Sequence, residues 1–178
     1  AQTDERVRRM AAGLVALGIE PEQRVALASS TRIEWVLADL AVMLAGAATT
    51  TIYPTTSESD LTFIAQDSQS RIVFAEDDAQ IAKLRANREQ LPDLVKVVTF
   101  DGTADGDWAI SLADLEHLGA TQLAEAPTAV DDRIGAIEPQ HLATLIYTSG
   151  TTGRPKGVRL SHDAWTYEAA AVDAIGIL

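Results

Sequence analysis

Residues 145–157 read LIYTSGTTGRPKG, and the chain is organised around this stretch. A short apolar, β-prone run passes abruptly into hydroxyl residues and three glycines, Gly150, Gly153 and Gly157. Glycine lets the backbone adopt positive φ and approach a ligand closely. Successive exposed N–H groups in such a loop form an anion-binding nest, and a lysine adds a point charge suited to phosphate. The stretch therefore predicts a strand that leads into a loop holding a polyphosphate.

This loop is not the common nucleotide-triphosphatase loop. That signature requires a glycine, four residues of any kind, then Gly-Lys followed by Ser or Thr. Here Gly153 is followed by Arg154, and Lys156 is followed by Gly157. The pattern is nevertheless too particular to be a generic surface turn.

The string YTSGTTGRPKG at 147–157 resembles the phosphate-binding signature of the adenylate-forming (AMP-binding) superfamily. This superfamily includes acyl-CoA synthetases, luciferases and the adenylation domains of peptide synthetases. The upstream segment MLAGAATTTIYPTTS at 43–57 is similar to another part of the same enzymes, and its IYPTTS looks most like long-chain fatty acyl-CoA synthetases. The resemblance spans essentially the whole chain. It is most specific over 145–162 and least specific over 75–130.

The resemblance implies an activity and a set of binding residues. The activity is ATP-dependent activation of a long-chain fatty acid, first to an acyl-adenylate and pyrophosphate and then to acyl-CoA. ATP, Mg²⁺ and coenzyme A would be its cofactors and small-molecule partners. The triphosphate loop would comprise Thr148, Ser149, Gly150, Thr151, Thr152, Gly153 and Lys156. No residue of this chain is assigned a catalytic or a metal-binding role.

Apolar periodicity predicts an α/β fold. Helical patterns begin near residues 7, 33, 57, 79, 111 and 161, and β-prone runs lie between them at 24–29, 49–53, 71–75, 96–100, 142–147 and 158–160. Because these runs are almost continuously apolar, we expect a mostly parallel sheet with helices on both faces. The segment 119–132 is rich in Ala and Thr and is interpreted as mostly irregular.

The pattern also predicts where helices begin and which faces they bury. Thr31 with Glu34 is spaced as a capping box. Helix starts are expected at Ser57 with Asp60 and at Ser111 with Asp114, which caps a short helix through Leu118, and Ser161 is expected to cap the last helix. The second helix is expected to bury one apolar face, made of Ile33, Val36, Leu37, Leu40 and Leu44. Trp165 is expected in the core, and the acidic residues Asp67, Glu76, Asp77 and Asp78 are expected on a solvated face.

Residues 1–178 are interpreted as an incomplete N-terminal α/β subdomain of an AMP-binding domain that ends just after the loop at 145–157. They would form part of the large N-terminal domain of an adenylate-forming enzyme. The remaining C-terminal part of the same enzyme is then an expected partner, and this fragment alone is expected to be inactive.

Composition narrows the class of protein. The net charge of −12 argues against non-specific nucleic-acid binding, which needs a basic footprint. The absence of cysteine excludes disulfides and thiolate metal sites, and the three histidines have no metal-ligand spacing. No apolar run is long enough for a transmembrane segment. We expect a cytoplasmic protein, with peripheral membrane association left open.

Other readings stay open at this point. One is a fatty acyl-AMP ligase or a peptide-synthetase adenylation domain, which passes the acyl group to a carrier protein. Another, of a different class, is a non-catalytic ATP-binding module. A third is a structural subunit that needs a partner chain.

Overall fold

The computed structural model describes residues 2–148 and 154–176. The helices are α1 (Gln2–Ala16), α2 (Ile33–Leu44), α3 (Glu58–Asp67), α4 (Asp78–Ala86), a 3₁₀ turn η1 (Arg88–Gln90), α5 (Leu112–Glu125), α6 (Ala129–Gly135) and α7 (His162–Ala174). The strands are β1 (Arg24–Ala28), β2 (Ala48–Ile52), β3 (Ile72–Ala75), β4 (Lys96–Thr99), β5 (Ala109–Ser111), β6 (Leu142–Thr148) and β7 (Lys156–Ser161).

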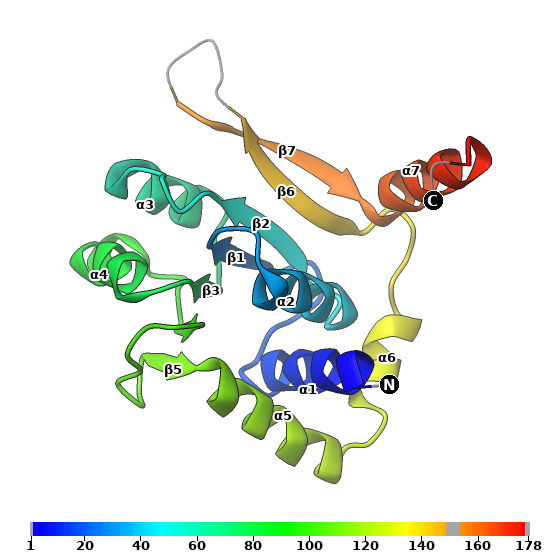
Figure 1. Cartoon of the computed structure of the whole chain (residues 1–178), viewed down its shortest axis with the longest axis horizontal. Coiled ribbons are helices and arrows are strands. Elements are labelled where there is room, and N and C mark those ends of the chain that lie inside the picture. The colour runs from blue at the N-terminus through cyan, green and yellow to red at the C-terminus, as the bar shows by residue number, and fades with distance from the viewer. Residues whose placement is uncertain (1, 149–153, 177–178) are drawn as a thin grey trace.

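These strands form one seven-stranded sheet in the order β5-β4-β3-β1-β2-β6-β7 (Figure 1). Every neighbouring pair is parallel except β6 and β7, which form an antiparallel hairpin. The prediction of a mostly parallel sheet is confirmed. Within the described residues, no helix is long and apolar enough to cross a membrane.

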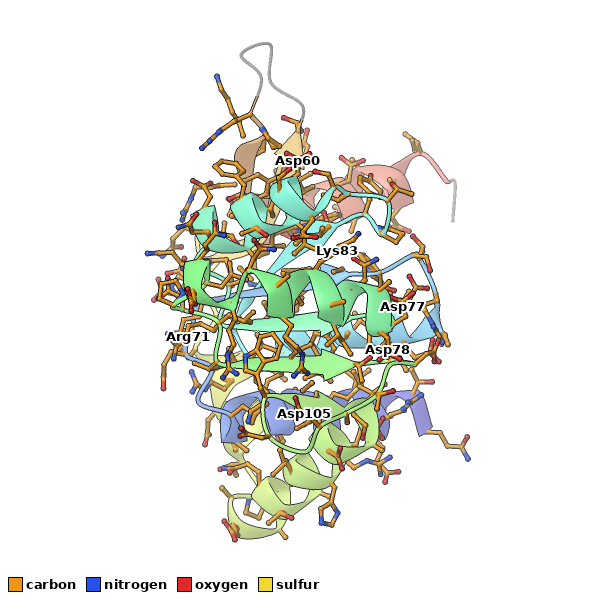
Figure 2. The ribbon with its side chains drawn as sticks, turned by 90° about the vertical axis from the view of Figure 1, so that its left-hand side faces the viewer. Asp60, Arg71, Asp77, Asp78, Lys83 and Asp105 are labelled. Atoms are coloured by element: carbon orange, nitrogen blue, oxygen red, sulfur yellow. The ribbon has the colours of Figure 1, made fainter. Side chains whose placement is uncertain are left out.

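Helices cover both faces of the sheet, as predicted. Alternate residues of a strand point to opposite faces, so Val25 and Leu27 of β1 pack in one cluster with α1, α2 and α5. Ala26 and Ala28 of the same strand pack in the other cluster, with α3 and α4. Figure 2 looks onto this second face, with α3 and α4 side by side in front of the strands. The core is therefore two layers on either side of one sheet.

The structure corrects two expectations about α2. Its N-cap is Arg32, with no side-chain hydrogen bond at the cap, so the predicted box of Thr31 and Glu34 does not form. The face against the sheet consists of Leu37, Ala38, Ala41 and Val42. Of the predicted inner face, Leu37 is buried and Leu44 packs against the core, but Ile33, Val36 and Leu40 are exposed. Ala38, Ala41 and Val42 take their place on the buried face.

The segment 119–132 is also corrected. It is mainly helical, because α5 continues to Glu125 and α6 begins at Ala129. The predicted cap of Ser111 with Asp114 at the start of α5 is confirmed. The edge strand β5 directly precedes α5 in the chain. Hydrophobic periodicity did not predict this strand, because only Ala109–Ser111 form it.

Candidate functional site

The carboxyl ends of four parallel strands meet along one edge of the sheet. β1 pairs with β2 and β3, and β2 pairs with β6, all in parallel register. The residues at or just past these ends are Ser29, Tyr53, Glu76 and Thr148. Open α/β sheets bind their ligands at this edge, commonly where the strand order reverses. We therefore expect a ligand-binding site along this edge of the sheet.

The reversal point itself, between β1 and β3, is filled by a carboxylate. The backbone N–H of Ser30 donates to Glu76 Oε2 at 2.9 Å, and the hydroxyl of Ser30 donates to Oε1. The guanidinium of Arg32 lies 3.9 Å from the same carboxylate. The reversal point is therefore occupied by side chains that bond to one another.

The acidic run that follows β3 is bonded rather than simply solvated. Asp77 caps α4 by accepting from the N–H of Gln80 at 3.0 Å, and Asp78 accepts from the N–H of Thr103 at 2.7 Å. Asp78 is exposed and Glu76 and Asp77 are partly exposed, so the expected solvated face is present, and its carboxylates also satisfy backbone donors.

A hollow of about 410 Å³ lies further along the edge, between the ends of β2 and β6 and the start of α3. Most of its lining residues carry a hydroxyl group; they are Thr51, Ile52, Tyr53, Thr55, Thr56, Ser57, Asp60, Ile64, Tyr147, Thr148 and Pro155. The side chain of Ser57 caps α3 by accepting from the N–H of Asp60 at 3.1 Å, as predicted. Donors of this kind suit a polar ligand.

Two of the predicted loop residues lie beside this hollow. Thr148 ends β6 and Lys156 begins β7, and the two are direct partners in the antiparallel register. The side chains of Thr148 and Lys156 are both exposed to solvent. The other predicted members, Ser149, Gly150, Thr151, Thr152 and Gly153, lie outside the described residues.

Tyr147 attaches the end of β6 to α3. Its hydroxyl donates to Asp67 Oδ2 at 2.6 Å, and its ring meets that of Phe63 edge-on, with centroids 6.4 Å apart. Burial, followed by the bond to the Asp67 carboxylate, raises the pKa of Tyr147 above its usual range. A Cβ on its register partner Gly157 would lie 3.3 Å from the tyrosine ring, so the glycine leaves room for the aromatic side chain.

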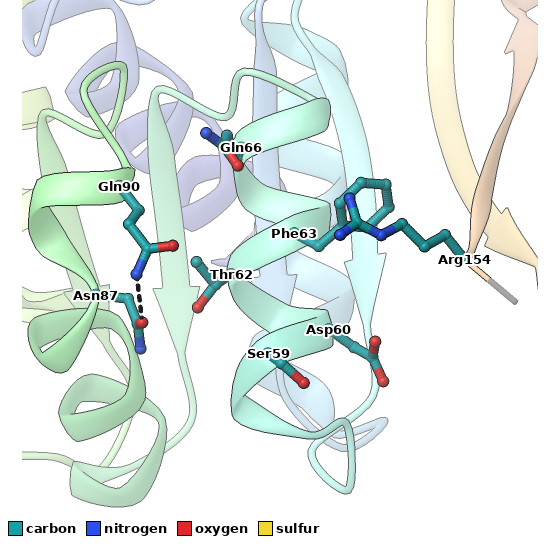
Figure 3. A pocket seen from close by; sticks show the side chains of 8 residues that line it. All are labelled: Ser59, Asp60, Thr62, Phe63, Gln66, Asn87, Gln90 and Arg154. Carbon is teal, nitrogen blue, oxygen red and sulfur yellow. Dashed lines mark hydrogen bonds between the residues drawn. The ribbon is translucent and has the colours of Figure 1, made fainter.

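Arg154 approaches the same helix from the other side of the loop. Its guanidinium carbon lies 5.2 Å from the centroid of the Phe63 ring. Figure 3 shows this contact at the rim of a polar hollow between α3 and α4, which Asn87 and Gln90 also line. Sequence reasoning did not single out Phe63, and it placed Asp67 on a solvated face without its contact, because nothing in their spacing indicates which distant segment they meet.

The remaining candidates do not form a second site. Among the described residues, no group of three or more His, Cys, Asp and Glu side chains could hold a metal ion. Burial lowers the pKa of His162, whose neighbour His141 adds to the effect. Trp165 is not in the core as expected: its side chain is 43% exposed and its indole N–H donates to the Thr144 hydroxyl at 3.0 Å.

A family model described as AMP-binding enzyme matches residues 1–177. The chain belongs to this family. Among curated relatives, the long-chain-fatty-acid–CoA ligase FadD15 of Mycobacterium bovis is 34% identical over 168 residues, which cover 94% of this chain and 27% of that protein. The long-chain-fatty-acid–CoA ligase ACSBG2 of Xenopus laevis is 33% identical, covering 94% of this chain and 22% of that protein. This AMP-binding chain thus spans about a quarter of the length of these relatives.

Solved structures agree on the fold. The apo structure of MbtA from Mycobacterium smegmatis superposes with a TM-score of 0.79 at 28% identity, covering 99% of this chain and 31% of that one. An anthranilate CoA ligase, AuaEII, in complex with anthranoyl-AMP, gives a TM-score of 0.77 at 22% identity, covering 95% and 30%. The AMP-binding chain therefore has the fold of one portion of these larger proteins.

Proposed function

We propose that the protein carrying this chain activates a fatty acid in two steps. The acid's carboxylate attacks the α-phosphate of ATP, which gives an acyl-adenylate and releases pyrophosphate. The thiol of coenzyme A then attacks the mixed anhydride and releases AMP. The relatives' names support a long-chain acid, and Mg²⁺ would enter with the ATP. We place the reaction in the cytoplasm, with peripheral membrane association left open.

One observation carries the nucleotide part of this proposal. Thr148 and Lys156 are register partners at the carboxyl edge of the sheet, beside a hollow lined with hydroxyl groups. A lysine there can offset the charge that grows on the leaving pyrophosphate. The seven loop residues Thr148, Ser149, Gly150, Thr151, Thr152, Gly153 and Lys156 remain the proposed triphosphate site.

The decisive experiment is acid-dependent exchange of labelled pyrophosphate into ATP by the whole protein, with short, medium and long fatty acids. We expect exchange that is greatest with long acids. Tight ATP binding without exchange for any acid would instead favour a non-catalytic ATP-binding module. Adding coenzyme A or a carrier protein to preformed acyl-adenylate then identifies the acceptor.

The substitution Lys156→Ala tests the role of the lysine. We expect exchange to slow about five- to hundredfold, because a charge-assisted contact contributes about 1 to 3 kcal/mol. Transfer from preformed acyl-adenylate to coenzyme A should change less. The matched control is Lys96→Ala, at the amino end of β4 and hence at the opposite edge of the sheet. An equal loss in both half-reactions would contradict the assignment.

A further inference from the structure

Both ends of the loop at 145–157 contact one face of α3. Tyr147, directly before Thr148, donates its hydroxyl to Asp67, and Arg154, directly after Gly153, lies over the ring of Phe63. Phe63 and Asp67 are four residues apart in the helix, so their side chains lie on the same face. Phe63 also contacts the Tyr147 ring. One aromatic ring and one carboxylate therefore hold both ends.

The sheet does not support this part of the hairpin. β6 pairs with β2 only from Thr144 to Ile146. Tyr147 and Thr148 therefore have no partner in β2. Beyond that point β6 pairs only with β7, which is the edge strand. Figure 1 shows the hairpin projecting past the rest of the sheet. The direction in which it projects has to be fixed by contacts other than the ladder.

The negative charge of Asp67 is at an unfavourable position in its own helix. It is the last residue of α3, where a negative charge opposes the partial negative charge of the helix C-terminus. Its partner, the tyrosine hydroxyl, makes a hydrogen bond to an ionised acceptor, and bonds of that kind are shorter and stronger than neutral ones. The carboxylate thus serves the contact between α3 and the hairpin.

We propose that Phe63 and Asp67 are positioning residues, which orient the two ends of the phosphate loop through Arg154 and Tyr147 and so set the affinity for ATP. This inference rests on the proposed function for the ATP-binding role of the loop. Neither residue needs to touch the nucleotide. With the ends fixed, less conformational freedom is lost when the loop's donors bind phosphate.

The test uses Asp67→Ala, Asp67→Asn, Tyr147→Phe and Phe63→Leu in the whole protein. For Asp67→Ala and Tyr147→Phe we expect the KM for ATP in pyrophosphate exchange to rise about five- to tenfold, with the KM for the fatty acid unchanged. Asn keeps an acceptor oxygen, so Asp67→Asn should restore part of the ATP affinity. Phe63→Leu removes the ring that both ends contact and should raise the KM for ATP as well.

A double-mutant cycle separates a shared contact from two independent effects. The combination of Asp67→Ala and Tyr147→Phe should raise the KM for ATP no more than either change alone, because both remove the same hydrogen bond. Tyr147→Phe has a matched control in Tyr167→Phe, on the exposed surface of α7. Thermal melting of each variant identifies any loss of folded protein.

Additive effects, an unchanged KM for ATP, or equal rises in both KM values would overturn the proposal. The dissociation constant for ATP, measured by equilibrium dialysis, distinguishes its failure from that of the proposed function. If the unsubstituted protein binds ATP but exchanges no pyrophosphate, the enzymatic function fails, while a weaker ATP affinity in Asp67→Ala still supports positioning. An unsubstituted protein that binds no ATP overturns both.

Discussion

Two glycines allow the first and fifth helices to pack backbone against backbone. A Cβ on Gly119 of α5 would lie 1.7 Å from the carbonyl oxygen of Arg9, and one on Gly13 of α1 would lie 2.4 Å from that of Leu115. Both obstacles are backbone atoms, which cannot rotate away as a flexible side chain can. The contact between α1 and α5 therefore requires glycine at both positions, because its side chain is a single hydrogen atom.

At this scale we predict that Gly119→Ala is strongly destabilising. The two helices would have to separate, and overpacking of this kind costs about 3 kcal/mol or more when backbone has to move. The matched control is Gly135→Ala on α6, where an added Cβ meets nothing within 4 Å. Urea unfolding of both variants gives the comparison. Equal midpoints for the two variants would show that the α1–α5 contact is not as close as described.

At the scale of an element, the turn at 101–108 between β4 and β5 is organised by one carboxylate. Asp105 Oδ1 accepts from the N–H groups of Asp107 and Ala109, both at 2.9 Å, and Oδ2 accepts from the Arg85 guanidinium at 2.9 Å. Figure 2 labels Asp105 on the face in front of the sheet. These bonds to the ionised form lower the pKa of Asp105 to about 2. Most residues of this turn are exposed, and these bonds order it.

This lowered pKa predicts an acid dependence of stability. An aspartate in an unfolded chain titrates near pH 4, at about 3.9. Because its folded pKa is lower, Asp105 stabilises the fold above about pH 4, and that contribution is lost as pH falls towards about 2. Asp105→Asn should lower the urea midpoint at pH 7, and its difference from the unsubstituted chain should shrink at pH 2.

Asp107→Asn provides the control for this prediction. Asp107 lies in the same turn, but it contributes its backbone N–H to Asp105 rather than its carboxylate. We expect little change in its midpoint at either pH. A difference between Asp105→Asn and the unsubstituted chain that stayed constant from pH 7 to pH 2 would rule out titration of Asp105 as the cause.

At the scale of the whole molecule, we propose that this chain supplies only part of the active site. The chain spans about a quarter of the length of its curated relatives. Within the described part, α7 buries no side chain, and the outer stripe of α2 leaves Ile33, Val36 and Leu40 exposed. A nucleotide loop on such a scaffold can hold phosphates, but adenylation also needs a bound acid and a positioned α-phosphate.

We therefore predict that the 178-residue chain, expressed alone, forms no acyl-adenylate while the whole protein does. Pyrophosphate exchange measures both, and circular dichroism of the isolated chain establishes that it is folded. Exchange by the isolated chain at the rate of the whole protein would mean that this portion is catalytically sufficient.

Much of the architecture and the family could be predicted from the sequence. Alternating apolar runs and helical periodicities are local, so they predicted the main strands, the helices on both faces and the capping by Ser57 and Ser111. The stretch at 145–157 is local too, and it indicated the family that the comparisons show. Periodicity was only partly right at α2, where Leu37 is buried as predicted but Ile33, Val36 and Leu40 are exposed, and it failed at 119–132, which is mainly helical.

What only the tertiary structure decided was which distant segments meet. The sequence alone determined a mostly parallel α/β sheet and a glycine-rich stretch at 145–157, because hydrophobic period and backbone freedom are properties of neighbouring residues. It did not determine that β6 lies beside β2 or that Glu76 fills the reversal point. Nor did it determine that Phe63 and Asp67 hold the ends of the loop. Those pairings join residues far apart along the chain, and only the free energy of packing the whole core selects them.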